Sequence, residues 1–266
     1  MSRIQKKFLA LKNAKQKALI VFLTAGDPSF KKNEELIHAF EKEGADLIEI
    51  GVPFSDPLAD GPVIQAASQR SLKKGTTLPQ ILKLVRQVRK RSELPLILMS
   101  YLNPIWHYGL QKFAKEARRS GVDGVIVPDL PPEEGRDVEK AFKKQKLDLI
   151  YLLAPTSGAS RQRAVARRCR GFIYYVSLTG VTGIRKKLSN ELVSNVRAIQ
   201  RVSGLPVCAG FGISTPEQAK AVCAAADGVI IGSAVVKAID ANRGVNASVI
   251  AKKILRPFAR ALGKVL

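Results

Sequence analysis

The chain has 266 residues, 46% of them hydrophobic, which is enough to bury a large core. Lys and Arg number 44 against 22 Asp and Glu, a formal net charge of +22 at pH 7. No apolar run approaches the roughly 20 residues that cross a bilayer, and the three cysteines, which form no CxxC pair, argue against both a disulfide framework and a zinc site.

The first segment of the chain is basic and precedes the apolar run Ala18–Ala25, an order that loosely resembles a targeting peptide. Within the basic part, however, Ile4, Phe8 and Leu11 fall at helical spacing, which predicts a short amphipathic helix leading into a first strand. The apolar run ends at Gly26, followed by Asp and Pro, which is a turn sequence rather than a cleavage site. We therefore expect a mature, cytoplasmic chain.

Short apolar runs rich in β-branched residues recur along the chain. They are near-continuously apolar, as strands covered on both faces are. We predict strands at Leu19–Thr24, Leu47–Gly51, Leu96–Tyr101, Gly124–Pro128, Leu149–Ala154, Phe172–Ser177, Pro206–Ala209 and Gly228–Ile231. Amphipathic stretches between them predict helices at Asn33–Glu43, Pro62–Lys74, Leu78–Arg91, Leu110–Ser120, Pro132–Gln145, Ser160–Cys169, Ser189–Val202, Pro216–Ala225 and Asn246–Leu262.

This alternation is typical of a parallel sheet covered by helices. Eight βα units predict an α/β fold, a (β/α)8 TIM barrel forming one domain over residues 1–266. An extra N-terminal helix and an extra helix after strand 2 complete the prediction. A doubly wound sheet is the alternative. Pro257 is expected to kink or divide the last helix.

Two carboxylates mark the stretch Leu47–Pro62, LIEIGVPFSDPLADGP, a strand followed by a proline-broken loop. Glu49 lies among apolar strand residues, where burial raises the pKa of a carboxyl. Asp60 lies in the polar loop and more easily stays ionised. Both lie at the C-terminal end of a barrel strand, where active sites of this fold lie, so we predict that they divide acid and base roles. In the alternative reading, Glu49 pairs with a buried cation and Asp60 caps a turn.

Glycine-rich turns follow the last three strands: TGVTG (Thr179–Gly183), AGFGI (Ala209–Ile213) and Gly232-Ser233-Ala234. Exposed backbone N–H groups and a short helix N-terminus at such loops form an anion site. We therefore predict a phosphorylated small-molecule ligand. Its expected contacts are the Ser233 hydroxyl and the amides near Gly183, Gly212 and Gly232.

Apolar and aromatic residues at or just past the strand ends are expected to complete the pocket. They are Phe22, Ile64, Tyr101, Tyr175 and Phe211, of which Tyr175 can also form a hydrogen bond. Phe22 and Ile64 taken alone fit plain barrel core equally well.

The sequence lacks the residues that several other kinds of catalysis require. No strand end carries a Lys for a Schiff base, the two histidines are too far apart for a metal-dependent aldolase site, and no GxGxxG follows a strand. The remaining reading is acid/base catalysis by carboxylates on a phosphorylated substrate, with no metal and no cofactor in this chain.

The positive charge is spread along helix after helix, without interleaved aromatic residues or a nucleic-acid motif. We read it as a basic solvated surface that can steer an anionic ligand. We expect no specific nucleic-acid partner and at most weak, salt-sensitive binding to DNA.

Over essentially its whole length the sequence resembles the tryptophan synthase alpha subunit. GVPFSDPLADGP, beginning at Gly51, and SLTGVTG, ending at Gly183, are the most specific motifs. Further similar segments are FLTAGDP (Phe22–Pro28), MSYLNPI (Met99–Ile105), GVIVPDLPPEE (Gly124–Glu134), LLAPTS (Leu152–Ser157), GFGIST (Gly210–Thr215) and GVIIGSAVV (Gly228–Val236).

The resemblance implies a barrel lyase that cleaves indole-3-glycerol phosphate to indole and glyceraldehyde 3-phosphate. Glu49 then matches the acid/base, and Asp60 the residue that accepts the indole N–H and stabilises the protonated ring. Tyr175 matches a substrate-positioning tyrosine, and Thr182 a lid residue that engages Asp60. The phosphate contacts are matched by Gly183, Gly212, Gly232 and Ser233.

The resemblance also implies a beta subunit that carries pyridoxal phosphate, in an alpha-beta-beta-alpha assembly that passes indole through a tunnel. The matching contact segments are Pro53–Asp56, Asn103–Ile105 and Asp129–Pro132. The basic surface is the one departure from the family. Three alternatives stay open: another phosphate-binding barrel isomerase of the same pathway, a non-catalytic activator of the beta subunit, and a nucleic-acid binder.

Overall fold

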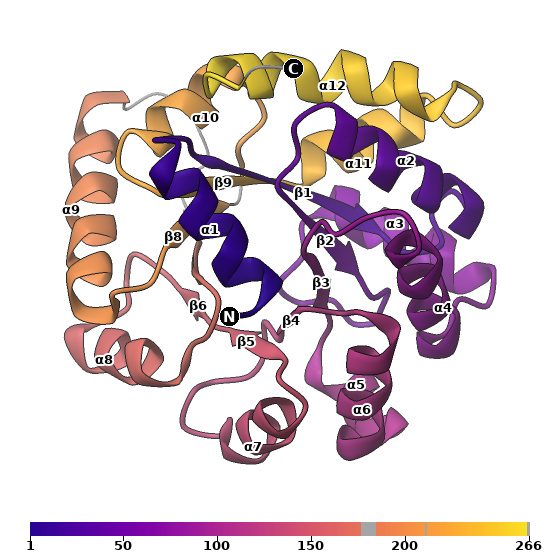
Figure 1. The fold of residues 1–266 in the computed structure, drawn as a ribbon, viewed down its shortest axis with the longest axis horizontal. Helices are drawn as coiled ribbons and strands as arrows, with labels where there is room; N and C mark the ends of the chain where they lie inside the picture. The colour runs from indigo at the N-terminus through magenta and orange to yellow at the C-terminus, as the bar shows by residue number, and fades with distance from the viewer. Residues whose placement is uncertain (177–184, 211, 265–266) are drawn as a thin grey trace.

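The computed structural model describes residues 1–176, 185–210 and 212–264. Within these ranges, parallel strands form one sheet in the order β5-β4-β3-β2-β1-β9-β8-β7-β6. The strands are β1 (Ala18–Thr24), β2 (Leu47–Gly51), β3 (Leu96–Met99), β4 (Gly124–Ile126), β5 (Asp148–Ile150), β6 (Leu152–Leu153), β7 (Ile173–Val176), β8 (Val207–Gly210) and β9 (Gly228–Ile231). Figure 1 shows them as a ring with helices around it.

The ring closes within the predicted fifth strand, which the structure divides into β5 and β6. The first half pairs with β4, and the second half pairs with β7. Between the halves, the carbonyl of Tyr151 accepts a hydrogen bond of 3.0 Å from the Tyr174 amide. One continuous segment therefore serves both neighbours, which makes the sheet a nearly closed barrel and confirms the predicted (β/α)8 fold over a doubly wound sheet.

Apart from the first helix, which lies across one end of the ring, the helices cover its outside (Figure 1). In the described part of the chain they are α1 (Arg3–Asn13), α2 (Phe30–Lys42), α3 (Pro62–Lys73), α4 (Leu78–Arg89), α5 (Leu102–Tyr108), α6 (Leu110–Ser120), α7 (Arg136–Lys144), α8 (Ala159–Arg168), α9 (Arg185–Ser203), α10 (Pro216–Cys223), α11 (Ser233–Ala241) and α12 (Ala247–Ala261). The two predicted additions are present as α1 and as α3 followed by α4. None of these helices has the length and apolarity needed to cross a bilayer.

Some predicted boundaries were wrong. Helix α2 begins at Phe30 because the Ser29 hydroxyl caps it by accepting from the Lys32 amide at 3.2 Å. Helix α7 begins at Arg136 because the preceding residues form turns. The short helices α5 and α11 were not predicted as helices.

Pro257 does not divide the last helix, since α12 continues through it. Proline has no N–H, so the Lys253 carbonyl has no helical hydrogen-bond donor at position 257. Both Lys253 and Pro257 lie on the exposed face of α12. Water can satisfy that carbonyl there, which removes much of the usual cost of an internal proline.

Helix α1 covers the N-terminal end of the barrel. Its apolar residues Ile4, Phe8 and Leu11 are buried with the inward-facing residues of the strands. The ring of Phe8 lies 5.6 Å from that of Phe172. At its start, the Ser2 hydroxyl donates to Asp148 at 2.6 Å. Helix α1 therefore closes the interior of the barrel at this end.

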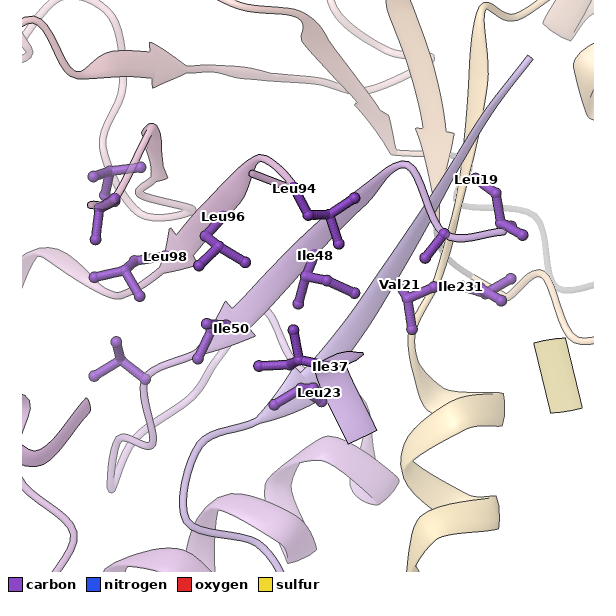
Figure 2. Close-up of a cluster of buried hydrophobic side chains, with 14 of the residues drawn as sticks. Leu19, Val21, Leu23, Ile37, Ile48, Ile50, Leu94, Leu96, Leu98 and Ile231 are labelled. Atoms are coloured by element: carbon purple, nitrogen blue, oxygen red, sulfur yellow. The ribbon is translucent and has the colours of Figure 1, made fainter. Parts of the chain in front are cut away.

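Strand residues alternate between the inside of the barrel and the layer beneath the helices. Figure 2 shows the outer set, to which Leu19, Val21 and Leu23 of β1 and Ile48 and Ile50 of β2 belong. The residues between them point inward. This alternation places Phe22 and Glu49 inside the barrel.

Candidate active site

A cavity of about 280 Å³ opens at the C-terminal ends of the strands. Side chains of β1, β2, β3, β7 and β9 and the loops after β2, β8 and β9 form its wall. Its lining comprises Phe22, Glu49, Asp60, Gly61, Pro62, Val63, Ile64, Met99, Tyr174, Gly212, Ile213, Ile230, Gly232 and Ser233. It is thus an apolar pocket with a few polar groups, as small-molecule sites are.

Glu49 is fully buried in the middle of β2. Neither carboxyl oxygen has a hydrogen-bond partner among the residues that the structure describes. Burial alone raises the pKa of Glu49 to about 8. The side chain is therefore protonated at neutral pH and can give a proton to a bound molecule, as the sequence analysis expected of a carboxyl in this position.

Asp60 is held in the loop between β2 and α3. Its amide donates to the carbonyl of Pro57 at 3.0 Å, and its own carbonyl accepts from the Gln65 side chain at 2.9 Å. Burial raises the pKa of Asp60 to about 6, opposed by a hydrogen bond from the Tyr101 hydroxyl. Asp60 is therefore mostly ionised at pH 7, so one cavity holds a proton donor and an anion.

The far side of the cavity presents a helix N-terminus. Helix α11 begins at Ser233, its N-cap Gly232 makes no side-chain cap bond, and its first turn has no acidic residue. Its first N–H groups have no carbonyl acceptor within the helix, which favours an anion here. Gly212 joins this end with φ +75°, a backbone conformation that glycine readily adopts. A glycine-rich loop beside a helix N-terminus is the arrangement in which proteins often bind phosphate groups.

Known proteins of one family match nearly the whole chain. The family model of the tryptophan synthase alpha chain matches residues 8–261. The tryptophan synthase alpha chain of Geobacter sulfurreducens is 54% identical over 237 residues, which cover 89% of this chain and 90% of that one. That of Thermoanaerobacter sp. is 44% identical over 266 residues, all of both chains. The chain belongs to the tryptophan synthase alpha chain family.

Solved structures of the tryptophan synthase alpha chain have the same fold. The subunit from Legionella pneumophila superposes with a TM-score of 0.92 at 40% identity and covers 100% of both chains. A structure of tryptophan synthase from M. tuberculosis gives a TM-score of 0.88 at 31% identity, with 98% of both chains covered.

As a member of this family, the chain is a carbon–carbon lyase of tryptophan biosynthesis. It cleaves indole-3-glycerol phosphate to indole and glyceraldehyde 3-phosphate and works with a beta subunit. None of these matches favours a pathway isomerase, a non-catalytic activator or a nucleic-acid binder.

The structure brings seven of the predicted site residues together around the cavity: Phe22, Glu49, Asp60, Ile64, Gly212, Gly232 and Ser233. Tyr101 does not line it but donates to Asp60 at 3.3 Å. Thr182, Gly183 and Phe211, with the whole TGVTG turn, lie outside the described residues.

Tyr175 is the prediction that the structure corrects. Its side chain belongs to the outer layer, and its hydroxyl accepts a hydrogen bond of 3.1 Å from Asn195 on α9. Tyr174 lines the cavity instead, because alternate strand residues face opposite sides. A hypothetical Cβ on Gly210 would lie 2.4 Å from the Tyr174 hydroxyl oxygen, so glycine at this position leaves room for the phenol.

Sequence reasoning also missed Met99 and Ile230, apolar wall residues of β3 and β9. The alternation of side chains along each strand, counted from Phe22 and Glu49, could have predicted that they face the interior. Among the described residues, no group of three or more His, Cys, Asp or Glu side chains is placed to hold a metal ion.

Proposed function

We propose that Glu49 is the acid and the base of the cleavage and that Asp60 stabilises the charged ring. Protonated Glu49 gives its proton to the ring carbon that bears the glycerol chain, and the ring becomes cationic. Asp60 accepts a hydrogen bond from the ring N–H and offsets this charge. The Glu49 carboxylate then takes the proton of the glycerol hydroxyl. The carbon–carbon bond breaks, and its electron pair returns to the ring.

This sequence leaves Glu49 protonated again, with indole and an aldehyde as products. The observation that carries it is the state of Glu49, which is fully buried, has no hydrogen-bond partner among the described residues and has a pKa of about 8. A group whose pKa lies close to neutral can both give and take a proton at low cost.

The remaining site residues are proposed to bind the substrate. Phe22, Ile64 and Tyr174 face the same apolar space as the carboxylates and would hold the indole ring. The cradle of Gly212, Gly232 and Ser233 would bind the phosphate. We retain Gly183 as a phosphate contact, Thr182 as the lid residue that engages Asp60 and Phe211 as a wall residue, on the resemblance alone.

We further propose an alpha-beta-beta-alpha assembly in which the beta subunit carries pyridoxal phosphate and this chain carries no cofactor. The expected contact segments, Pro53–Asp56, Asn103–Ile105 and Asp129–Pro132, all follow C-terminal strand ends, on the same side as the cavity. Leu58 is 95% exposed and Trp106 58% exposed beside these segments. Large apolar side chains exposed on one face support a partner surface there.

Cytoplasmic localisation and one domain over residues 1–266 complete the proposal. Support for one domain comes from the continuous ring of strands and from the matched family model, which spans residues 8–261. A metabolic reaction on a small phosphorylated molecule supports a cytoplasmic localisation.

The decisive test is indole release from indole-3-glycerol phosphate by the purified chain, with and without the beta subunit. We expect turnover that rises when the beta subunit is added. Glu49→Gln should fold normally and lose at least about a hundredfold in kcat, the usual contribution of a general acid/base. Glu93→Gln is the matched control, because Glu93 is a surface residue paired with Arg3. Parental turnover in Glu49→Gln would refute the role of Glu49.

A further inference from the structure

One phenol oxygen holds two consecutive residues of the loop that carries Asp60. The Tyr101 hydroxyl accepts a hydrogen bond from the Ala59 amide at 2.8 Å and donates to the Asp60 carboxylate at 3.3 Å. Tyr101 is only 6% exposed, so its ring has little freedom to move. The backbone and the carboxylate of this loop are thus fixed relative to each other through one side chain.

Tyr101 also contacts a second part of the loop that carries Asp60, and the loop after β4 holds the backbone next to it. Its ring packs against Phe54, in the loop after β2, with centroids 5.3 Å apart. Tyr101 is the N-cap residue of α5 but makes no side-chain cap bond. The carboxylate of Asp129, in the loop after β4, accepts from the Leu102 amide at 2.9 and 3.2 Å in its place. The loops after β2, β3 and β4 therefore meet at Tyr101.

These three loops contain the proposed partner contacts. Phe54 belongs to Pro53–Asp56, Asp129 begins Asp129–Pro132, and α5 carries Asn103–Ile105. We propose that Tyr101 is a positioning residue, which holds the Asp60 carboxylate in place and couples docking of the beta subunit on these loops to that carboxylate. This inference rests on the role of Asp60 proposed above.

The electrostatics agree with a donor role for the Tyr101 hydroxyl. Burial and the negative charge of Asp60 raise the pKa of Tyr101 above its ordinary value, so the phenol keeps its proton. A hydrogen bond given to a carboxylate favours its ionised form, and this bond lowers the pKa of Asp60 against the effect of burial. Asp60 must be ionised to stabilise a cationic ring. The same hydrogen bond therefore holds the carboxylate in position and favours its ionised form.

The test is Tyr101→Phe, which keeps the ring against Phe54 and removes the hydroxyl. We expect kcat/KM at pH 7 to fall roughly tenfold or more, the usual effect of losing a hydrogen bond to a charged group. The acid limb of the pH profile of kcat/KM should move to higher pH. The substrate phosphate also titrates near this limb, but its pKa is the same for both enzymes, so the difference reports on Asp60.

The second readout is stimulation by the beta subunit. The ratio of kcat/KM with and without a saturating beta subunit should fall towards one in Tyr101→Phe, while the affinity of the two chains stays unchanged. Tyr108→Phe is the matched control, because Tyr108 lies on the same helix and its hydroxyl donates to Glu116 at 2.5 Å, not to Asp60. We expect the control to keep the parental pH profile and stimulation.

Asp60→Asn separates this inference from the proposed function. Lost turnover in Asp60→Asn, together with a parental profile and parental stimulation in Tyr101→Phe, would refute the role of Tyr101 alone. Equal changes in Tyr101→Phe and Tyr108→Phe would refute it as well, because they would indicate a general effect on α5. Retained turnover in Asp60→Asn would refute both roles.

Discussion

Phe22 on β1 and Glu49 on β2 are paired in the parallel ladder, and both face the interior of the barrel. The Phe22 ring extends over Gly51, where an added Cβ would lie 2.4 Å from the ring atom Cζ. Because Gly51 has no side chain, the Phe22 ring has room to lie over β2, the strand that carries Glu49. Glu49 is fully buried in the same interior, and this burial raises its pKa to about 8.

The contact between Phe22 and Gly51 predicts the effect of Gly51→Ala. The new methyl group must displace the Phe22 ring, so we expect a loss of roughly 1 to 3 kcal/mol in the free energy of unfolding, as in other overpacked cores. The KM for indole-3-glycerol phosphate should rise as well. Denaturant unfolding and steady-state kinetics measure the two effects. Gly158→Ala is the control, since a Cβ there meets nothing within 4 Å. Equal stability of both variants would contradict the argument.

The buried acid predicts an unusual dependence of stability on pH. The folded chain keeps the Glu49 proton up to about pH 8, whereas the unfolded chain loses it near pH 4.5. Between these values the unfolded state is favoured increasingly as pH rises, so the free energy of unfolding falls. Glu49→Gln does not titrate and escapes this loss.

We therefore expect Glu49→Gln to gain stability relative to the parent between pH 5 and pH 9. Each pKa unit corresponds to roughly 1.4 kcal/mol, and about three units lie between pH 5 and the pKa of Glu49, so the gain should be about 4 kcal/mol. Denaturant unfolding at both pH values measures it. Glu93→Gln should show no such gain, because the Arg3 guanidinium lowers the pKa of Glu93 and this group is ionised throughout the range. A stability difference independent of pH would mean that Glu49 titrates normally.

The two carboxylates predict a bell-shaped pH profile for kcat/KM. Activity should fall below about pH 6, as Asp60 becomes protonated, and above about pH 8, as Glu49 loses its proton. The substrate phosphate contributes to the acid limb, and the pH dependence of glyceraldehyde 3-phosphate binding reports that contribution separately. Activity that continues to rise beyond pH 9 would show that ionised Glu49 starts the reaction.

The N-terminus of α11 predicts a charge effect on phosphate binding. Ser233→Asp places a carboxylate at the proposed cradle, so we expect KM to rise roughly tenfold or more by like-charge repulsion, with a smaller change in kcat. Ser248→Asp makes the same change in the first turn of α12, which does not line the cavity, and should leave KM unchanged. Steady-state kinetics at low ionic strength compares the two. An unchanged KM in Ser233→Asp would show that the phosphate binds at another place.

Local patterns were enough to predict the barrel and its principal residues. The alternation of apolar strands with amphipathic helices predicted the fold because each period reflects one kind of buried face. Glu49 stood out as a charge inside an apolar strand, and Gly232 with Ser233 stood out as a glycine turn after the last predicted strand. These features depend on neighbours along the chain, which the sequence displays directly.

Tertiary structure decided what depends on neighbours across the barrel. Only the ladder showed that Tyr174, and not Tyr175, enters the cavity, because a shift of one residue moves a strand side chain to the opposite face. Only the meeting of three loops showed that Tyr101 bonds to Asp60. The raised pKa of Asp60 comes from burial in the folded chain, and burial sums contacts from residues far apart in sequence. The sequence by itself thus determined which groups are available, and the packing of the strands decided which of them face one another.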